Sequence, residues 1–280
     1  MTTVQDIYRF IDQVAPFVIQ ESWDNAGMLV GHWKRPVQKI LVTLDITPEV
    51  VYEAEKVGAD LIVAHHPILF HPAKQVTDGG MDLVGQRVLA LAERGICCHT
   101  NWDSAQGGVN YVLAKLCGLE KQQILEVSGT DEQGVPYGIG RMGTLPLPVA
   151  LEDYLKLLQG SLEPNGLRYV DGGKPVRRVA VGGGSCADGM HEAQVAVGGG
   201  ACGGMLEQVA KAGCDTFVTG DVKYDQFLDA KMLGINLIDA GHYPTEDPSM
   251  LVLGYQLAKA FPEVTVQKSK LHREVIQYQV

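Results

Sequence analysis

Short apolar runs alternate with helix-like segments through about the first 120 residues, and this alternation limits the folds open to the chain. The runs are rich in β-branched and aliphatic residues, as buried strands are, and the segments between them repeat apolar residues at helical spacing. Strands that alternate with helices imply a mainly parallel sheet covered by helices. We expect strands at 39–45, 60–66 and 95–100, and helices at 3–14, 47–57, 81–94 and 107–116.

The chain changes character near residue 120. Residues 133–138 and 145–148 are rich in Gly and Pro, which predicts shorter pieces there, followed by a helix at 148–158. From Val176 the alternation of strands and helices resumes and runs past residue 260. We therefore expect two α/β lobes, 1–125 and 126–280, with the C-terminal segment packing back on the first; strand-like pieces at 264–267 and 275–279 would close a sheet.

A histidine doublet, His65-His66, ends the apolar run before Pro67. Neighbouring strand residues point to opposite faces, so two adjacent imidazoles rarely serve one packing purpose. At the carboxyl end of a strand in an α/β protein, both rings can turn into the crevice where ligands bind. The doublet is therefore a candidate site for one metal ion or two neighbouring ions, the alternative being a pair of surface histidines.

Two further apolar runs also end in residues that bind divalent metals. The run at 95–100 leads to Asp103, and the run at 235–241 leads to His242 and Glu246. Nitrogen and carboxylate donors of this kind suit Zn, Mn, Fe, Co or Ni rather than a thiolate site. Pro244 and Pro248 predict that the segment from His242 to Glu246 is an extended loop, with Asp247 capping a helix that starts at Pro248.

Composition excludes several classes of protein. A formal net charge of −10 argues against a mainly nucleic-acid-binding surface, although a locally basic groove or pore would be compatible with it. We expect a cytoplasmic, globular protein, because no apolar stretch approaches a membrane span and the N-terminus lacks a signal sequence. The six cysteines show no Cys-x-x-Cys spacing and are expected to be free thiols.

A glycine-rich block occurs twice, at 179–186 and at 195–202. Its second copy, with Gly203, fits G-x-G-x-x-G, and the next predicted strand ends near Asp221, which is the layout of a dinucleotide-binding fingerprint. Gly-rich turns between strand and helix are common in α/β folds, and the chain has 33 glycines, so a chance match is the simpler interpretation. A phosphate of a nucleotide substrate is another candidate occupant.

Several polar residues near these strand ends are further candidates for the site. Asp24 and Asn25 lie in a turn-like stretch, which predicts either an Asx turn or contacts to ligands and substrate. His99 lies inside the run at 95–100, as a core residue or a supporting group of the site. The residues expected to line the cleft from strand ends are Asp45, Asp221 and Tyr224.

The chain resembles the NIF-three-like proteins, the GTP cyclohydrolase 1 type 2 homologues. The matching stretches run in the family's order over nearly the whole chain: 22–31 (SWDNAGMLVG), 64–67 (AHHP), 99–103 (HTNWD), 219–224 (TGDVKY) and 239–246 (DAGHYPTE). Two departures are the Asp225-Gln226 pair, where many relatives carry a histidine, and the repeated glycine-rich block, of which we predict one copy to be an insertion.

This resemblance implies two α/β lobes with a dinuclear metal centre in the cleft between them, and a ring-shaped homohexamer. The metal ligands implied are His65, His66, Asp103, His242 and Glu246, with Glu246 bridging two divalent ions. The activity implied is a hydrolase in which a metal-bridged hydroxide attacks a nucleotide-type small molecule, with Glu246 and His99 as catalytic residues. The alternative is a non-enzymatic, metal-containing hexameric ring that acts as a binding or regulatory scaffold.

Overall fold

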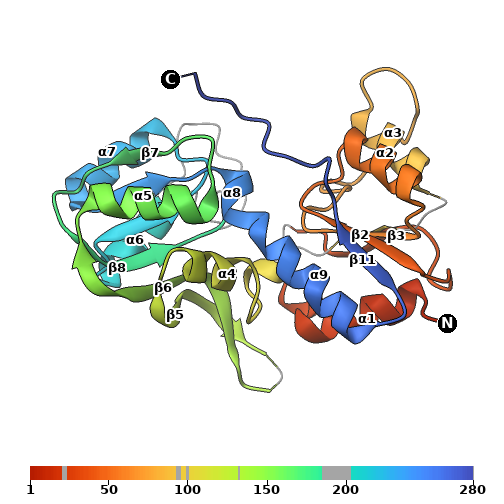
Figure 1. The fold of residues 1–280 in the computed structure, drawn as a ribbon, viewed down its shortest axis with the longest axis horizontal. Coiled ribbons are helices and arrows are strands. Elements are labelled where there is room, and N and C mark those ends of the chain that lie inside the picture. The colour runs from red at the N-terminus through yellow and green to blue at the C-terminus, as the bar shows by residue number, and fades with distance from the viewer. Residues whose placement is uncertain (21–23, 93–95, 99–100, 132, 185–202, 280) are drawn as a thin grey trace. The chain divides into compact units, whose positions relative to one another are not determined.

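A computed structural model of the chain describes residues 1–20, 24–92, 96–98, 101–131, 133–184 and 203–279. The chain divides into two compact units, each with its own sheet (Figure 1). The first unit comprises Met1–Ala105 and Ser249–Arg273, and the second comprises Gln106–Pro248 and Glu274–Val280. The sequence predicts a boundary near residue 125. In the structure, the first unit ends at Ala105 and also includes residues 249–273.

The sheet of the first unit has five strands in the order β1-β4-β3-β2-β11. The strands β2, β3, β4 and β11 are parallel, and only β1 runs antiparallel to its neighbour. Their bounds are β1 Gly27–Val30, β2 Lys39–Thr43, β3 Leu61–Ala64, β4 Ile96–Cys98 and β11 Thr265–Lys268. The parallel sheet expected from the alternating pattern is thus present.

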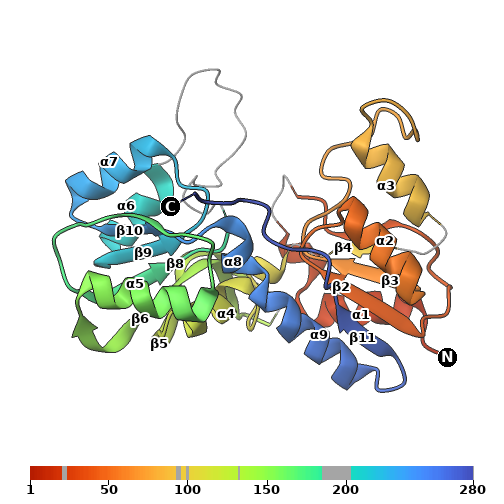
Figure 2. The same cartoon turned by 45° about the horizontal axis from the view of Figure 1, so that its top comes forward.

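Helices cover both faces of this sheet (Figure 2). Its helices are α1 Val4–Val14, α2 Pro48–Val57, α3 Leu83–Leu91 and α9 Pro248–Ala260, with single 3-10 turns at Phe17–Ile19 and Asn101–Asp103. Leu41 packs with the apolar faces of α2 and α3. The next residue, Val42, points to the opposite face, where it lies near Gly254 of α9. The first helix begins as predicted, because Thr3 and Asp6 form a reciprocal capping box.

The second unit is built on a mixed sheet in the order β5-β6-β8-β9-β10-β7. Its centre, β8-β9-β10, is parallel, and β5, β6 and β7 are added antiparallel. One apolar cluster lies under α4 and α5 and a second under α6 and α7, so helices cover both faces. The bounds are β5 Glu120–Thr130, β6 Pro136–Val149, β7 Arg168–Val170, β8 Val176–Val181, β9 Thr216–Thr219, β10 Asn236–Asp239, α4 Val109–Leu116, α5 Leu151–Leu162, α6 Gly203–Lys211 and α7 Tyr224–Leu233.

The segment expected to be broken into short pieces is instead a long hairpin of β5 and β6. Strand β6 continues through Pro146 and Pro148 because its pairing with β8 is interrupted there, between Thr144 and Val149. A proline donates no backbone hydrogen bond, so it is tolerated where the ladder is already irregular. The predicted helix at 148–158 accordingly begins later, as α5.

The predicted extended loop before Pro248 is wrong, since His242–Glu246 forms the short helix α8. Pro244 is the third residue of this helix, where a backbone N–H would have no intrahelical partner, so proline costs no hydrogen bond. Helix α9 does begin at Pro248, as expected. Asp247, however, has helical backbone angles (φ −55°, ψ −34°) rather than the extended ones of an N-cap.

The two strand-like pieces near the C-terminus have different outcomes. The first became β11, which pairs with β2 in the first unit. The second, at 275–279, is not a strand: it runs without regular structure, and Asn165 donates a hydrogen bond to the carbonyl of Ile276 (2.6 Å).

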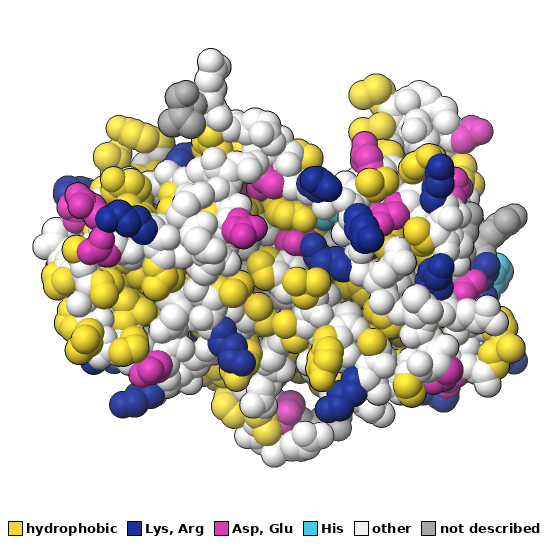
Figure 3. All heavy atoms as spheres, in the orientation of Figure 1, with side chains coloured by type: hydrophobic (Ala, Val, Ile, Leu, Met, Phe, Trp, Pro, Cys, Tyr) yellow, Lys and Arg dark blue, Asp and Glu magenta, His cyan; other side chains and the backbone are white. Residues whose placement is uncertain are grey.

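Among the described residues, no helix is long and apolar enough to cross a membrane. On the face in view in Figure 3, basic and acidic side chains are interspersed with hydrophobic ones.

Candidate functional site

The histidine doublet lies directly after β3, at the carboxyl end of the first sheet. The backbone N–H of His65 donates to the carbonyls of Thr43 and Leu44, and that of His66 donates to Leu44 (3.0 Å). These bonds extend the β2–β3 pairing and hold both residues at the strand end. The His65 ring is buried, whereas the His66 side chain is 30% exposed. The doublet is therefore a fixed, partly accessible pair of imidazoles.

Asp103 lies beside the first of these rings. Its Oδ2 is 3.6 Å from Nε2 of His65. That distance is too long for a good hydrogen bond. It is close to the roughly 3.4 Å that separates two ligands sharing one ion in tetrahedral geometry. His65 and His66 also offer ligand nitrogens within 4.8 Å of one another. His65 thus has an imidazole and a carboxylate as neighbours, both of them donor groups of the kind that bind divalent metal ions.

Asp45 follows β2 and binds two histidines. Its Oδ1 is 2.8 Å from Nδ1 of His66, and its Oδ2 is 3.2 Å from Nε2 of His272. Burial raises the pKa of Asp45, but the hydrogen bonds from His272 and His66 outweigh burial and hold this pKa well below its usual range. Asp45 is therefore a carboxylate anion that orients the His66 ring. Sequence reasoning predicted Asp45 at the site but did not identify His272.

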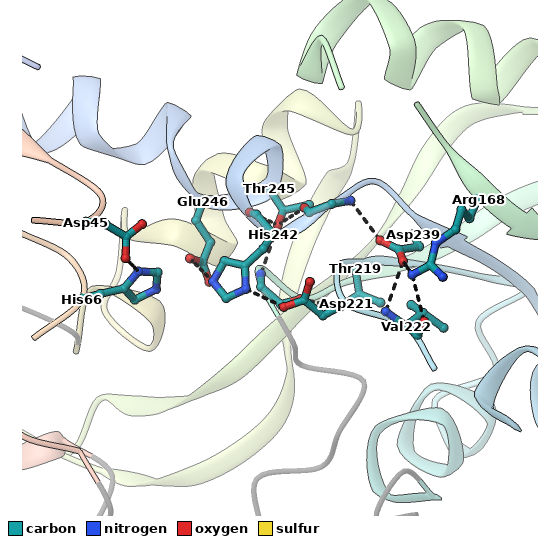
Figure 4. A network of polar contacts seen from close by, with 12 residues as sticks. Asp45, His66, Arg168, Thr219, Asp221, Val222, Asp239, His242, Thr245 and Glu246 are labelled. Carbon is teal, nitrogen blue, oxygen red and sulfur yellow. Dashed lines mark hydrogen bonds and ion pairs between the residues drawn. The ribbon is translucent and has the colours of Figure 1, made fainter. Parts of the chain in front are cut away.

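The second unit contains a corresponding arrangement on α8 (Figure 4). His242 and Glu246 begin and end this helix, one turn apart, so their side chains share one face. Nε2 of His242 is 2.8 Å from Oε2 of the buried Glu246, and Nδ1 is 2.8 Å from Oδ2 of Asp221. Asp221 lies just beyond β9 with a positive φ of 54°, a backbone strain that aims its carboxylate at the ring.

The two carboxylates change the protonation of His242. Burial by itself lowers the pKa of this imidazole, but the hydrogen bonds to Asp221 and Glu246 reverse that effect and raise it to about 11. The hydrogen bond from His242 in turn lowers the pKa of Asp221. The group is therefore an imidazolium held between two anions, which is the charge balance that a bound cation would replace.

Two glycines leave room for these side chains. A Cβ on Gly184, whose φ is +57°, would lie 2.2 Å from Oε1 of Glu246 and 3.0 Å from Nε2 of His242. A Cβ on Gly183 would lie 3.2 Å from Cγ of Glu246. The backbone N–H of Gly184 donates to Oγ1 of Thr245 (3.0 Å), which fixes the loop against α8. A larger residue at Gly184 would fill the space beside the side chains of Glu246 and His242.

Each unit thus contains the same local device. In each, Nδ1 of a histidine donates a hydrogen bond to a carboxylate that lies just beyond a parallel strand. The pairs are His66 with Asp45 and His242 with Asp221. In metal sites, such a carboxylate fixes the tautomer and presents Nε2 to the ion. His242 already directs Nε2 at a second carboxylate, that of Glu246.

The remaining predicted residues have separate environments. Asp24 accepts the backbone N–H of the next residue, Asn25, at 2.7 Å, and the N–H two positions on, which an Asx turn would use, donates to Gln20 instead. Asn25 donates to the carbonyl of Leu69 (2.5 Å), so it holds two loops of the first unit together. Tyr224 is largely exposed at the start of α7. His99 and the second glycine-rich copy at 195–202 lie outside the described residues.

Sequence reasoning also missed a polar network in the second unit, next to Asp221. Asp239, at the end of β10, binds Arg168 and accepts the backbone N–H of Val222 at 3.1 Å (Figure 4). Arg168 also donates to the carbonyl of Val222 (2.9 Å), so both ends of this pair brace the residue after Asp221. The available signal was an aspartate at the end of a predicted strand, the same signal that pointed to Asp45.

Comparison with known proteins identifies relatives over nearly the full length. The family model described as Duf34/NIF3 (NGG1p interacting factor 3) matches residues 2–195 and 193–274. The two matches overlap at 193–195, where the second copy of the glycine-rich block begins. A GTP cyclohydrolase 1 type 2 homolog of Clostridium perfringens is 33% identical over 89% of this chain and 88% of its own. One of Clostridium acetobutylicum is 31% identical over 94% and 92%.

Solved structures with the same fold are also found. A hypothetical protein of Staphylococcus aureus superimposes with a TM-score of 0.84 at 28% identity, over 99% of both chains. A Bacillus cereus protein related to NIF3 gives a TM-score of 0.86 at 23% identity, over 100% of this chain and 99% of its own. The α/β fold with two sheets is therefore shared with experimentally determined structures.

Proposed function

The chain belongs to the Duf34/NIF3 family, and from this premise we propose that it is a metal-dependent hydrolase acting on a nucleotide-type substrate. The observation that carries the proposal is the carboxylate–histidine pair that recurs in both units, Asp45 with His66 and Asp221 with His242. Paired carboxylates of this kind orient histidine ligands in metal sites. The curated relatives named GTP cyclohydrolase 1 type 2 homolog suggest the substrate class.

We propose that two divalent ions bind per chain. All donors are imidazole nitrogens or carboxylate oxygens, a set that suits Zn, Mn, Fe, Co or Ni. Glu246 is the donor that we propose both ions would share. It is buried beside His242, next to the space lined by Gly183 and Gly184. The proposed ligands are His65, His66, Asp103, His242 and Glu246.

The side chains would have different roles in such a metal site. When bound, two divalent ions would polarise a substrate oxygen and acidify water. Asp45 and Asp221 would hold their histidines in one tautomer and direct Nε2 towards the ions. His242 would give up its proton on loading, and Glu246 and His99 are the residues to which we assign proton transfer. Opening of a purine ring, as the relatives' name suggests, is the reaction to assay first.

Assembly is part of the proposal. The family resemblance of the sequence implies a ring-shaped homohexamer, and we propose that state for this chain. Sedimentation velocity of the purified protein measures it directly, because a hexamer of a 30.3 kDa chain is well separated from a monomer or dimer. A monomer that nevertheless binds metal and turns over substrate would remove the ring from the proposal and leave the site intact.

Metal analysis tests the proposal. We expect about two ions per chain in the wild type by plasma mass spectrometry. His65→Ala should hold at least one ion fewer, because a buried ligand is lost. His32→Ala removes an exposed histidine of the same unit and should leave the content unchanged. Purine-nucleotide hydrolysis should follow the metal content across the three proteins.

Two results would contradict this. Wild-type protein that binds no metal, even after reconstitution with Zn, Mn, Fe, Co and Ni, would rule out a metal-dependent hydrolase. Protein that holds two ions but hydrolyses no nucleotide would exclude the enzymatic reading and favour a metal-containing scaffold.

Metal binding should depend strongly on pH through His242. Despite burial, its two carboxylate partners raise the pKa of this ring to about 11, whereas an ion requires the neutral imidazole. An ion and a proton therefore compete below that pKa, and the apparent affinity should rise with pH by up to about tenfold per unit. Competition titrations with Zn at about pH 6, 7 and 8 measure this slope. Asp221→Asn should flatten it, because it removes one group that raises the pKa.

A further inference from the structure

The segment after β11 is held by a buried glutamate of α2. Oε2 of Glu53 accepts the hydroxyl of Ser269 (2.5 Å) and the backbone N–H of Leu271 (3.1 Å), and Oε1 accepts the N–H of Lys270 (3.0 Å). Burial raises the pKa of Glu53, but these hydrogen bonds outweigh it and lower the pKa. A single carboxylate thus ties three consecutive residues of the C-terminal segment to the first unit.

This turn positions His272. The backbone N–H of His272 donates to the same Ser269 hydroxyl oxygen at 3.1 Å, and its side chain is buried. Ser269 itself donates its backbone N–H to the carbonyl of Val42 at 2.7 Å, near the end of β2. The turn is therefore attached to the strand that leads into Asp45. Nε2 of His272 reaches Oδ2 of Asp45 at 3.2 Å.

The two oxygens of Asp45 are divided between two rings. Oδ2 faces His272, and Oδ1 faces Nδ1 of His66 at 2.8 Å. A carboxylate with partners on both oxygens is fixed in rotation, whereas one with a single partner can turn about its side-chain bonds. The orientation of the His66 ring follows that of Asp45, because the carboxylate holds one of its two ring nitrogens.

We propose that His272 is a positioning residue for metal binding, acting through Asp45 on the ring of His66. The inference rests on the proposed function, since it assigns His272 a part in the same metal site. The role is distinct from that of a ligand, because the ring of His272 contacts the far oxygen of the supporting carboxylate. Loss of such an outer partner typically weakens metal binding about 10- to 100-fold.

Two substitutions at one position separate positioning from packing. His272→Leu replaces the imidazole by an apolar side chain of similar size and so removes the donor to Asp45. His272→Gln keeps a donor, its side-chain amide, within reach of the same oxygen. Ser269→Ala loosens the turn by removing the hydroxyl that bonds Glu53 and the backbone N–H of His272, and it leaves the His272 ring in place. His32→Ala, an exposed histidine of the same unit, is the matched control.

The experiment is a Zn competition titration of the full chain against a chromophoric chelator, with thermal unfolding recorded for each variant. We expect His272→Leu to weaken one Zn-binding step about tenfold or more. We expect His272→Gln to recover most of that loss, Ser269→Ala to weaken the same step by less, and His32→Ala to match the wild type. We expect these differences in Zn affinity among variants that unfold at similar temperatures, so that a loss of stability does not explain them.

The two proposals fail in different ways. Wild-type protein that binds none of Zn, Mn, Fe, Co and Ni would overturn the proposed function. Wild-type affinity in His272→Leu would overturn only the positioning role, as would equal weakening in the Leu and Gln variants, which would indicate packing. If His272→Leu does not fold, Ser269→Ala decides: unchanged affinity in that variant overturns the inference, and weakened affinity supports it.

Discussion

Gly184→Ala is expected to lower the metal content by displacing the proposed ligands His242 and Glu246, and to destabilise the protein. The new Cβ would lie 2.2 Å from Oε1 of Glu246 and 3.0 Å from Nε2 of His242, so at least one of these side chains must move. The residue also has a φ of +57°, which costs a non-glycine residue about 1–2 kcal/mol. Overpacking adds about 1–3 kcal/mol. Urea unfolding and metal analysis of the same sample measure both effects.

Gly213→Ala is the matched control for this experiment. Gly213 has a φ of +68°, and a Cβ there would meet no atom within 4 Å. It therefore carries the same backbone strain without any contact to the site. We expect it to lose about 1–2 kcal/mol and to retain its metal. If Gly184→Ala behaves like Gly213→Ala in both measurements, the glycine-lined space is not needed by the site.

Glu246→Gln should abolish most activity while leaving the fold intact. The substitution keeps the shape of a buried side chain but removes the anion that lies 2.8 Å from Nε2 of His242. Metal ligation supplies several kcal/mol of charge stabilisation, so we expect turnover to fall by at least about a hundredfold. The metal content should fall by at least one ion. Steady-state kinetics and plasma mass spectrometry on one preparation record both changes.

Glu207→Gln is the corresponding control, because Glu207 is exposed on α6 and pairs only with its helical neighbour Lys211 in the contacts described. Such an exposed pair contributes little to stability, so this variant should match the wild type. Full metal content and full turnover in Glu246→Gln would remove Glu246 from both of its proposed roles.

The sequence predicted the first sheet well because its elements are marked locally. Thr3 and Thr47 each precede a helix as capping residues, and the apolar run before His65 has the composition of a buried strand. Strand ends in a parallel sheet meet at one edge, so residues such as Asp45 could be assigned to the site without coordinates.

Other features depended on information that lies outside the local pattern. Pro244 predicted a loop because prolines usually break helices, and only its place in the first turn of α8 makes it compatible. Pro146 likewise suggested a break, but β6 continues past it where its pairing is irregular. The contact of His272 with Asp45 joins distant parts of the chain, and no spacing rule predicts it.

The first unit is interrupted in sequence by the second, and this has a consequence for synthesis. Strand β11 and most of helix α9 belong to the first unit but are translated after the whole block 106–248. Until the ribosome has passed Lys268, the outer edge of β2 has no strand to pair with, whereas the central strands of the second sheet have all been made. During synthesis, the first sheet therefore keeps an unpaired edge at β2 until β11 has been made, whereas the central strands of the second sheet can already pair.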